Sequence, residues 1–218
     1  MSKKAIIAGA SGLIGSNLLN ILLQQAFYDK VLVLVRKELP IMHHKLVQLV
    51  VDFEALEKHT KAINGHALFC CLGSTKKKTP DLKEYRKIDH DYPVALAQLA
   101  RQNGVEQYHL VSSIGADSKS SNFYTQMKGE TEDDIQKLGL KCLHIYEPSL
   151  LTGERKESRV LEYVMAGLMK VIDPLLMGGL KKYRSIPAQT VALAMFNEST
   201  KNEDSVFIHP SHKIKELA

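Results

Sequence analysis

The stretch of sequence that decides the fold is Lys4-Ala-Ile-Ile-Ala-Gly9-Ala-Ser-Gly12-Leu-Ile-Gly15. Its apolar run from Ala5 to Ala8 is too short for a helix with its own cap, and it predicts a buried parallel strand. Three glycines follow at the spacing G-x-x-G-x-x-G. Beyond them, leucines recur at helical spacing, at positions 18, 19, 22 and 23. A strand, a glycine turn and a helix in this order indicate a phosphate-binding turn.

Each glycine of this turn has a physical role in such a site. Gly9 allows a sharp turn off the strand, Gly12 allows close approach of a pyrophosphate, and Gly15 allows the helix to pack on the strand. The free N–H groups and the dipole at the helix start favour an anion. The alternative is an ordinary strand–helix turn with spare glycines. We expect a dinucleotide here, bound by Gly9, Ser11, Gly12, Leu13, Ile14 and Gly15.

Length and charge agree with a single α/β domain that binds a small anionic ligand. The chain of 218 residues has room for one sizeable core. We expect residues 1–218 to form one dinucleotide-binding domain, in which residues 152–218 contribute the substrate side. The net charge of +5 is mild, and it suits a polyanionic small ligand better than a nucleic acid. No nucleic-acid partner is expected.

The cysteines and the apolar runs bear on location and metal binding. Three cysteines, at positions 70, 71 and 142, form no C-x-x-C pair and no metal-ligand spacing. We therefore expect reduced packing residues, no metal site and a cytoplasmic protein. The glycines interrupt the first apolar run too early for a signal peptide. No apolar stretch reaches membrane-spanning length, so no membrane partner is expected.

Strand-like and helix-like segments alternate along the chain, which predicts a doubly wound parallel sheet of the Rossmann type. We expect a helix that starts at Thr79-Pro80, with Thr79 as its cap and Pro80 in its first turn, is interrupted near Pro93 and ends at about Asn103. Asn122 is expected to precede a helix over residues 123–138. Further strands are expected over residues 30–35, 45–51, 66–71, 107–113, 140–146 and 206–209.

The part of the chain after residue 151 is expected to form a small substrate or lid region. Residues 160–177 are apolar at helical spacing and include three methionines, Met165, Met169 and Met177. Core packing is one interpretation of this segment. A substrate lid or a subunit contact is the other, because methionine adapts to varied shapes. A strand that enters a helix is expected over residues 183–197.

The end of the second expected strand bears on the choice of cofactor. In this fold the residue just past that strand faces the adenosine ribose, where a carboxylate would accept from a free 2′-hydroxyl. Here the position is basic, with Arg36 followed by Lys37. Basic residues favour a 2′-phosphate, so we expect NADP(H). The alternative is a solvated arginine at a strand end.

The ends of the third and fourth expected strands supply further candidate contacts. Asp52, followed by Phe53, can meet the adenine amino group or can cap a helix over residues 54–61. The loop of small residues after the fourth strand lies where the ligand crevice is expected. Lys76 to Lys78 form either a solvated turn or a patch for phosphate or a partner. The expected cofactor contacts in the loop of small residues are Cys71, Leu72 and Gly73.

A second constellation points to acid–base chemistry. Tyr124 and Lys128 stand four residues apart on an expected helix, so both lie on one face. A lysine ammonium stabilises a phenolate, and the tyrosine can then exchange a proton with a carbonyl or an alcohol. Ser112 or Ser113, at the end of the preceding strand, can donate to the substrate oxygen. Taken alone the pair is a weak signal, because a lysine-rich chain supplies such pairs by chance.

The order of these elements resembles the short-chain dehydrogenase/reductase superfamily in its atypical branch. Within that branch the chain is similar to the Tat-interacting, metastasis-suppressor-like (CC3-like) group. The likeness extends to about Glu157, with a weaker match at residues 184–187. The residues that carry it are Gly9-Ala-Ser-Gly-Leu-Ile-Gly15, Val51-Asp-Phe-Glu54, Phe69-Cys-Cys-Leu-Gly-Ser-Thr75, Ile88-Asp-His-Asp-Tyr92, Val111-Ser-Ser-Ile-Gly-Ala-Asp117 and Ser120-Ser-Asn-Phe-Tyr124-Thr-Gln-Met-Lys-Gly-Glu130.

This resemblance implies an NADPH-binding Rossmann domain in which Tyr124, Lys128 and Ser113 are catalytic. Two positions depart from the superfamily pattern. Asp89 and its neighbours stand where the superfamily often has an asparagine for a proton relay, and Glu147 stands where arginine usually precedes proline. The second departure lies at the nicotinamide end. The remaining expected cofactor contacts are Ser112, Tyr124, Lys128, Pro148, Ser149 and Leu150.

Three functions fit these observations. The first is an NADPH-dependent oxidoreductase that acts on an unknown carbonyl or alcohol, as a monomer or a homodimer. The second is an NADPH-binding regulator that binds a protein partner without turnover, since a fold does not guarantee catalysis. The third is an enzyme similar to nucleotide-sugar epimerases, for which the chain is short.

Overall fold

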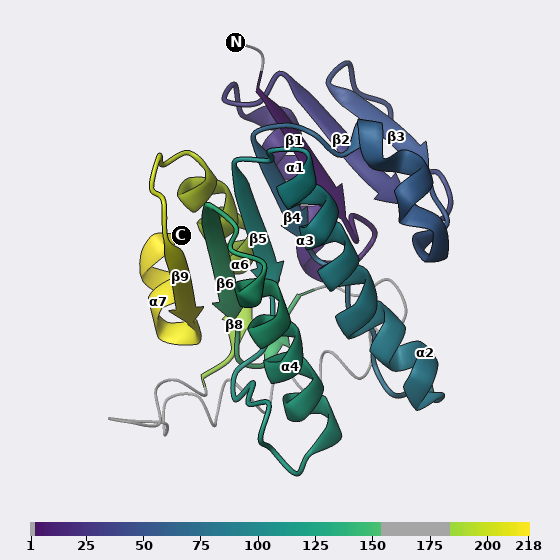
Figure 1. Ribbon diagram of the computed structural model, residues 1–218. Coiled ribbons are helices and arrows are strands. Elements are labelled where there is room, and N and C mark those ends of the chain that lie inside the picture. The colour runs from purple at the N-terminus through teal and green to yellow at the C-terminus, as the bar shows by residue number, and fades with distance from the viewer. Residues whose placement is uncertain (1–2, 154–183) are drawn as a thin grey trace.

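The computed structural model describes residues 3–153 and 184–218, and it has a parallel sheet at its centre (Figure 1). The expected helix over residues 160–177, with its methionines, lies outside the described residues. The strands run in the order β3-β2-β1-β4-β5-β6-β9, and every neighbouring pair is parallel. Their bounds are β1 Lys4–Ala8, β2 Lys30–Val35, β3 Leu46–Val50, β4 Ala67–Cys70, β5 Gln107–Val111, β6 Cys142–Glu147 and β9 Val206–Pro210.

Helices cover both faces of the sheet, which explains why its inner strands read as continuous apolar runs. Side chains of Ala5 and Ile7 face α1 (Leu13–Gln24) and α6 (Ala188–Ser199). Side chains of Ile6 and Ala8 face the opposite layer, to which α3 (Tyr92–Gln102) and α4 (Phe123–Lys137) contribute. Figure 1 shows α3 and α4 in front of the strands. The expected doubly wound architecture is confirmed.

The strand order reverses direction between β1 and β4. The chain passes outward from β1 through β2 to β3 and then returns to pair β4 with the other side of β1. In open α/β sheets a crevice forms beyond the carboxyl ends of the strands at this reversal. The glycine turn after β1 and the loop after β4 therefore meet where a ligand is expected.

Two expectations about the helical segment after β4 are wrong. Asp81 caps α2 (Leu82–Arg86) by accepting from the N–H groups of Lys83 at 2.7 Å and Glu84 at 3.1 Å. The hydroxyl of Thr79, the expected cap, lies instead 2.6 Å from the Ser74 hydroxyl. A carboxylate two residues further along thus takes over the capping.

The same segment is not interrupted at Pro93. A π-helical turn, η2 (Lys87–Asp91), joins α2 to α3, and Pro93 stands in the first turn of α3. Proline is tolerated in a first turn because its missing N–H has no partner to lose there. The irregularity precedes the proline, and it contains Asp89.

The remaining elements complete the two helical layers. A 3₁₀ helix, η1 (Phe53–Ala62), follows β3 in place of the expected α-helix. A second, two-stranded parallel sheet pairs β7 (Leu151–Thr152), which follows β6 in the chain, with β8 (Ile186–Pro187), which precedes α6. The last helix, α7 (Ser211–Leu217), follows β9. Among the described residues, no helix combines the length and apolar character that crossing a membrane requires.

Candidate dinucleotide site and catalytic pair

The glycine turn packs directly on the end of β4. Gly9 has a φ of +86°, a conformation that side chains disfavour. A Cβ added there would lie 2.5 Å from the carbonyl oxygen of Cys71. A Cβ at Gly15 would collide with the Gly9 carbonyl. Glycine is therefore required by the fold itself at both positions.

Gly12 differs from the other two glycines of the turn. Its backbone is extended, with φ −77° and ψ 173°, and a Cβ there would have its nearest neighbour, the Gly9 carbonyl oxygen, at 3.2 Å. The Gly9 carbonyl would have to move by a few tenths of an ångström to admit that Cβ. The packing of the protein thus gives a weaker reason for glycine here than at Gly9 and Gly15, whereas close approach of a ligand gives a strong one.

The start of α1 is suited to an anion. Gly12 is the cap residue and offers no side chain to the helix, and the first turn contains no acidic residue. Ser11 and Gly12 are exposed, whereas the side chain of Ile14 is buried in the core. The first-turn N–H groups and the helix dipole would therefore meet a ligand through backbone atoms.

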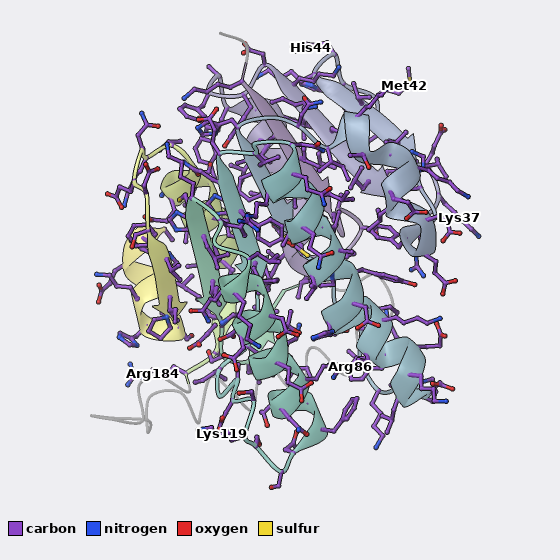
Figure 2. The ribbon with its side chains drawn as sticks, in the orientation of Figure 1. Lys37, Met42, His44, Arg86, Lys119 and Arg184 are labelled. Atoms are coloured by element: carbon purple, nitrogen blue, oxygen red, sulfur yellow. The ribbon has the colours of Figure 1, made fainter. Side chains whose placement is uncertain are left out.

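The basic residues expected at the 2′-phosphate follow β2 directly. Arg36 and Lys37 are both exposed. Within the part of the chain that the structure describes, neither forms an ion pair with the protein. Figure 2 shows the Lys37 side chain pointing away from the sheet. Both cations are available to a phosphate.

Asp52 forms one of its two expected contacts. Its carboxylate accepts from the N–H of Glu54 at 3.0 Å and so caps η1. Phe53 is buried and packs against Tyr92, with ring centroids 5.5 Å apart. The capping role is confirmed, and the adenine contact stays a prediction. Beyond β4, Cys71 and Leu72 are half-buried and Gly73 is exposed.

The candidate catalytic pair, Tyr124 and Lys128, lies on α4 at the expected spacing. Asn122 caps the helix by accepting from the N–H groups of Tyr124 at 3.0 Å and Thr125 at 3.3 Å. The Tyr124 side chain is 37% exposed, whereas Lys128, one turn later, is 5% exposed. A Cβ at Gly129 would collide with the backbone of Asp117 and Ser118, so the loop after β5 packs tightly on this turn of α4. Tyr124 is accessible and Lys128 is not.

Asp89 holds the lysine of this pair. The Lys128 Nζ lies 3.0 Å from the Asp89 Oδ1, and the Asp89 Oδ2 accepts from the Ser74 N–H at 2.7 Å. Burial lowers the pKa of Lys128, but the attraction of Asp89 and Tyr124 and the hydrogen bond to Asp89 outweigh it, so the net shift is upward. Lys128 is therefore an ammonium at neutral pH.

The two serines at the end of β5 are used differently. Ser112 donates to the carboxylate of Glu132, which stands one helical turn beyond Lys128. Burial raises the pKa of Glu132 to about 7, with the Ser112 hydrogen bond opposing this and Glu147 adding to it. The buried hydroxyl of Ser113 has no hydrogen-bond partner among the described residues. The Ser113 hydroxyl can therefore donate a hydrogen bond to a bound group.

The three residues after β6 that are expected to contact the cofactor have different surroundings in the structure. The Pro148 carbonyl accepts from the N–H of Ile114 at 3.0 Å, which joins the ends of β5 and β6. Ser149 is buried, donates to the Arg184 carbonyl and lies 2.8 Å from the Ser211 hydroxyl. Leu150 is 46% exposed. Ser149 thus serves the packing of the C-terminal part, and its cofactor contact stays a prediction.

Sequence reasoning missed two residues that support the pair. Asp89 was noted only as a departure from the superfamily asparagine, and its ion pair with Lys128 joins residues on different helices. Glu132 was not considered. Its position four residues after Lys128 was a usable signal, because residues at this spacing share a helix face.

Comparison with known proteins places the chain in a family. A family model described as NAD(P)H-binding matches residues 9–169. Protein HTATIP2 of Rattus norvegicus is 34% identical over 200 residues, which cover 90% of this chain and 81% of that protein. The mitochondrial protein FMP52 of Saccharomyces cerevisiae is 35% identical over 157 residues, covering 71% of this chain and 68% of its own.

Solved structures show the same fold. MoeE5 in complex with UDP-glucose and NAD superposes with a TM-score of 0.72 at 14% identity, over 94% of this chain and 75% of its own. The Bordetella bronchiseptica enzyme WbmH in complex with NAD+ gives 0.72 at 16% identity, over 99% of this chain and 79% of its own. Together with the turn that joins β1 to α1, these comparisons establish that the chain belongs to the NAD(P)H-binding family, with a Rossmann fold and with HTATIP2 and FMP52 among its relatives.

Proposed function

We propose that this protein is an NADP(H)-dependent oxidoreductase of the atypical short-chain dehydrogenase/reductase type that acts on a carbonyl or an alcohol. One observation carries the proposal. A buried serine hydroxyl without a hydrogen-bond partner among the described residues, that of Ser113, follows the strand whose next helix carries Tyr124 and Lys128. A buried polar group left without a partner is costly, and a substrate oxygen would supply one.

The glycine turn and the residues after β2 fit the cofactor. The first-turn N–H groups of α1 would hold the pyrophosphate, and Arg36 with Lys37 would hold the 2′-phosphate of NADP(H). When bound, the nicotinamide supplies or accepts a hydride at the substrate carbon. This role would explain why Gly12 is glycine although a Cβ there is less crowded than one at Gly9 or Gly15.

The residues of the chain would then handle the proton. Tyr124, which is 37% exposed, would pass a proton to or from the substrate oxygen, while Ser113 donates a hydrogen bond to the same oxygen. Lys128 would stabilise the phenolate form of Tyr124 by its charge. Asp89 is a positioning residue in this scheme, because it keeps the buried ammonium in place and charged.

Residues 152–218 would supply the substrate side. The two-stranded sheet of β7 and β8 supports this, because Gly153 after β7 lies against the glycine turn. A Cβ at Gly153 would be 3.2 Å from the Leu13 side chain. A cytoplasmic location and a monomeric or homodimeric state remain predictions, and several fungal relatives are named as mitochondrial. Fluorescence microscopy of the tagged chain would decide the location.

A kinetic assay with a tyrosine variant tests the enzyme. NADPH oxidation would be followed with a panel of aldehydes and ketones, for the wild type and for Tyr124→Phe. Loss of the phenol is expected to lower kcat by roughly 10²–10⁴-fold and to leave the Kd for NADPH unchanged. Unchanged turnover in Tyr124→Phe would remove this residue from the mechanism.

The second candidate is an NADPH-binding regulator without turnover. The buried carboxylate of Asp89 favours it. An ammonium whose positive charge is balanced by an adjacent carboxylate does less to stabilise the phenolate of Tyr124. In that case NADPH binds and stabilises the protein, but no carbonyl oxidises it. Pull-down with a tagged chain in the presence and absence of NADPH separates the two. Capture of a partner that is indifferent to NADPH counts against a cofactor-gated regulator.

An epimerase-like activity on nucleotide sugars is the third candidate. Solved structures with this fold include a UDP-N-acetylglucosamine 4-epimerase from Methanobrevibacter ruminantium, of which this chain covers 76%. Incubation with UDP-sugars and NAD(P)+ would show interconversion if this candidate holds.

A further inference from the structure

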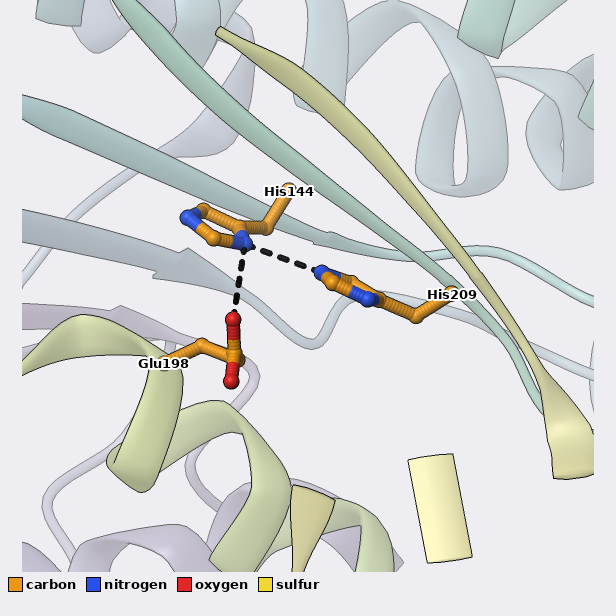
Figure 3. Close-up of side chains that lie close together, drawn as sticks. All are labelled: His144, Glu198 and His209. Carbon is orange, nitrogen blue, oxygen red and sulfur yellow. Dashed lines mark hydrogen bonds and ion pairs between the residues drawn. The ribbon is translucent and has the colours of Figure 1, made fainter. Parts of the chain in front are cut away.

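A buried cluster of two histidines and a glutamate lies on the far side of the sheet from the catalytic pair. His144 is on β6, His209 on β9 and Glu198 on α6, and their exposures are 1%, 6% and 3%. Two further strands, β4 and β5, separate β6 from the glycine turn after β1. Figure 3 shows the three side chains converging on one point between the edge strand and the helix.

The distances among the ligand-type atoms are close to those of a metal site. The Nδ1 of His144 lies 2.9 Å from the Nε2 of His209 and 4.0 Å from the Oε2 of Glu198. All three atoms lie within 4.8 Å of one another. Zinc binds imidazole and carboxylate at about 2.0–2.2 Å, so tetrahedral ligand atoms lie roughly 3.3 Å apart. The two observed distances bracket this value, and since the remaining pair of atoms lies within 4.8 Å, relative shifts of up to about 1.5 Å would close the set.

The neighbours of the cluster orient its members as outer ligands of a metal do. The Nε2 of His144 lies 3.2 Å from the Sγ of Cys142, and in the tautomer that places the proton on Nε2 the Nδ1 lone pair is directed at His209 and Glu198. The Nζ of Lys201 lies 2.6 Å from the Oε1 of Glu198 and leaves the second carboxylate oxygen toward the histidines. His144 and Glu198 are thus each held by a partner that is not itself a proposed ligand.

A neighbouring histidine shows what a purely structural imidazole looks like in this protein. The ring of His109 stacks on that of His144, with centroids 4.6 Å apart and planes 4° apart. Its Nδ1 lies 3.1 Å from the Tyr146 hydroxyl and its Nε2 lies 3.0 Å from the Gln107 Oε1. His109 therefore has no ring nitrogen to spare, whereas His144 and His209 direct theirs at each other and at a carboxylate.

We propose that His144, His209 and Glu198 bind a Zn²⁺ ion that fastens the edge strand β9 to α6. Two imidazoles and a carboxylate form a donor set that zinc prefers, with one position left for water. The expectation that the chain holds no metal site rested on cysteine spacing, and the proposed site uses no cysteine as a ligand. The proposal does not depend on the oxidoreductase activity.

Metal analysis of the full chain tests this site. The half-buried His43 and the exposed His44 stack with ring centroids 4.3 Å apart and would offer zinc an alternative surface site, so a His43→Gln/His44→Gln background removes it. After incubation with ZnCl₂ and gel filtration, this background protein is expected to retain about one zinc per chain. His109→Gln in the same background is the matched control and is expected to retain it.

Variants of the ligands complete the test. His209→Gln and Glu198→Gln are expected to lose the retained zinc while circular dichroism shows them folded. A zinc concentration about 100 times the Kd should raise the Tm of the background protein by about 5–10 °C. This measurement requires no ligand variant, so it decides the matter if such variants fail to fold. Absence of retained zinc and of a Tm shift, or zinc retained equally by His209→Gln, would overturn the proposal.

Discussion

The ammonium of Lys128 lies 3.0 Å from the carboxylate of Asp89, and both side chains are almost completely buried. Asp89→Asn keeps the size of the side chain but removes its charge. It is expected to destabilise the protein by about 3–5 kcal/mol at pH 7, because a buried ammonium loses its counter-charge. Urea unfolding measures this free energy.

A pH series sharpens this prediction. The pKa of Lys128 is raised in the folded protein, so its ion pair contributes stability below the ordinary value of 10.5 and loses it above. The difference in the free energy of unfolding between the wild type and Asp89→Asn should narrow as the pH rises from 7 toward 10.5. In the variant the buried Lys128 has lost its counter-charge and therefore gives up its proton more readily. Asp81→Asn is the control, because asparagine caps a helix as well as aspartate. A gap that is constant with pH would contradict the ion pair.

Two glycines of the turn, Gly12 and Gly15, are expected to serve different purposes, the first for ligand binding and the second for folding. Gly12→Ala should lower stability less than Gly15→Ala does, because its backbone is extended and its Cβ would lie 3.2 Å from the Gly9 carbonyl oxygen, whereas that of Gly15→Ala would collide with the same oxygen. It should weaken NADPH binding by roughly tenfold or more. Gly15→Ala is the contrast and should disrupt folding, because its Cβ meets the Gly9 carbonyl. Calorimetry and thermal unfolding would measure both effects, and NADPH affinity unchanged in Gly12→Ala would argue against the site.

Cofactor selectivity is expected to depend on Arg36. Arg36→Ala should weaken NADPH binding by about 10–100-fold, the effect of losing a hydrogen bond to a charged phosphate, and should leave NADH binding unchanged. Titration calorimetry of the apo protein with each cofactor measures this. Arg101→Ala, at an exposed arginine near the end of α3, is the matched control and should change neither affinity. Tighter NADH than NADPH binding in the wild type would refute the assignment.

Stability is expected to fall with rising pH because of Glu132. Burial raises the pKa of this carboxyl from 4.5 to about 7, so its favourable contribution is complete below pH 4.5 and is lost as the pH rises through 7. The loss is on the order of 2–3 kcal/mol. Glu132→Gln should match the wild type at pH 4.5 and exceed its stability at pH 8. Glu57→Gln, at an exposed position, should follow the wild type at every pH.

The framework of the fold could be predicted from the sequence because its signals are local. Buried parallel strands read as apolar runs, and the turn from β1 to α1 is announced by three glycines within seven residues. The π-helical turn at Lys87–Asp91 was not predicted. The proline at 93 suggested an interruption at its own position, whereas the irregular turn precedes it and Pro93 lies in the first turn of α3. The cap at Asp81 could not be predicted, because Thr79-Pro80, two residues earlier, is an equally typical start of a helix.

The polar partners of the candidate site could not be predicted, because they are distant in sequence. Asp89 and Lys128 are brought together by the packing of η2 against α4, and Ser112 meets Glu132 only when β5 and α4 are in place. The histidines of β6 and β9 are 65 residues apart. Periodicity indicates which face of an element is buried, but it does not indicate which buried polar groups meet there.

The pairing of β7 with β8 brings Leu151 beside Ile186 and Thr152 beside Pro187. Two points of the chain that are more than thirty positions apart in sequence thus lie side by side. The entropy cost of closing a flexible chain between two fixed points grows by only about 0.6 kcal/mol for each doubling of length, so the pairing depends little on the number of residues that join the two strands. Insertions between β7 and β8 are therefore expected to leave the sheet that carries the glycine turn intact.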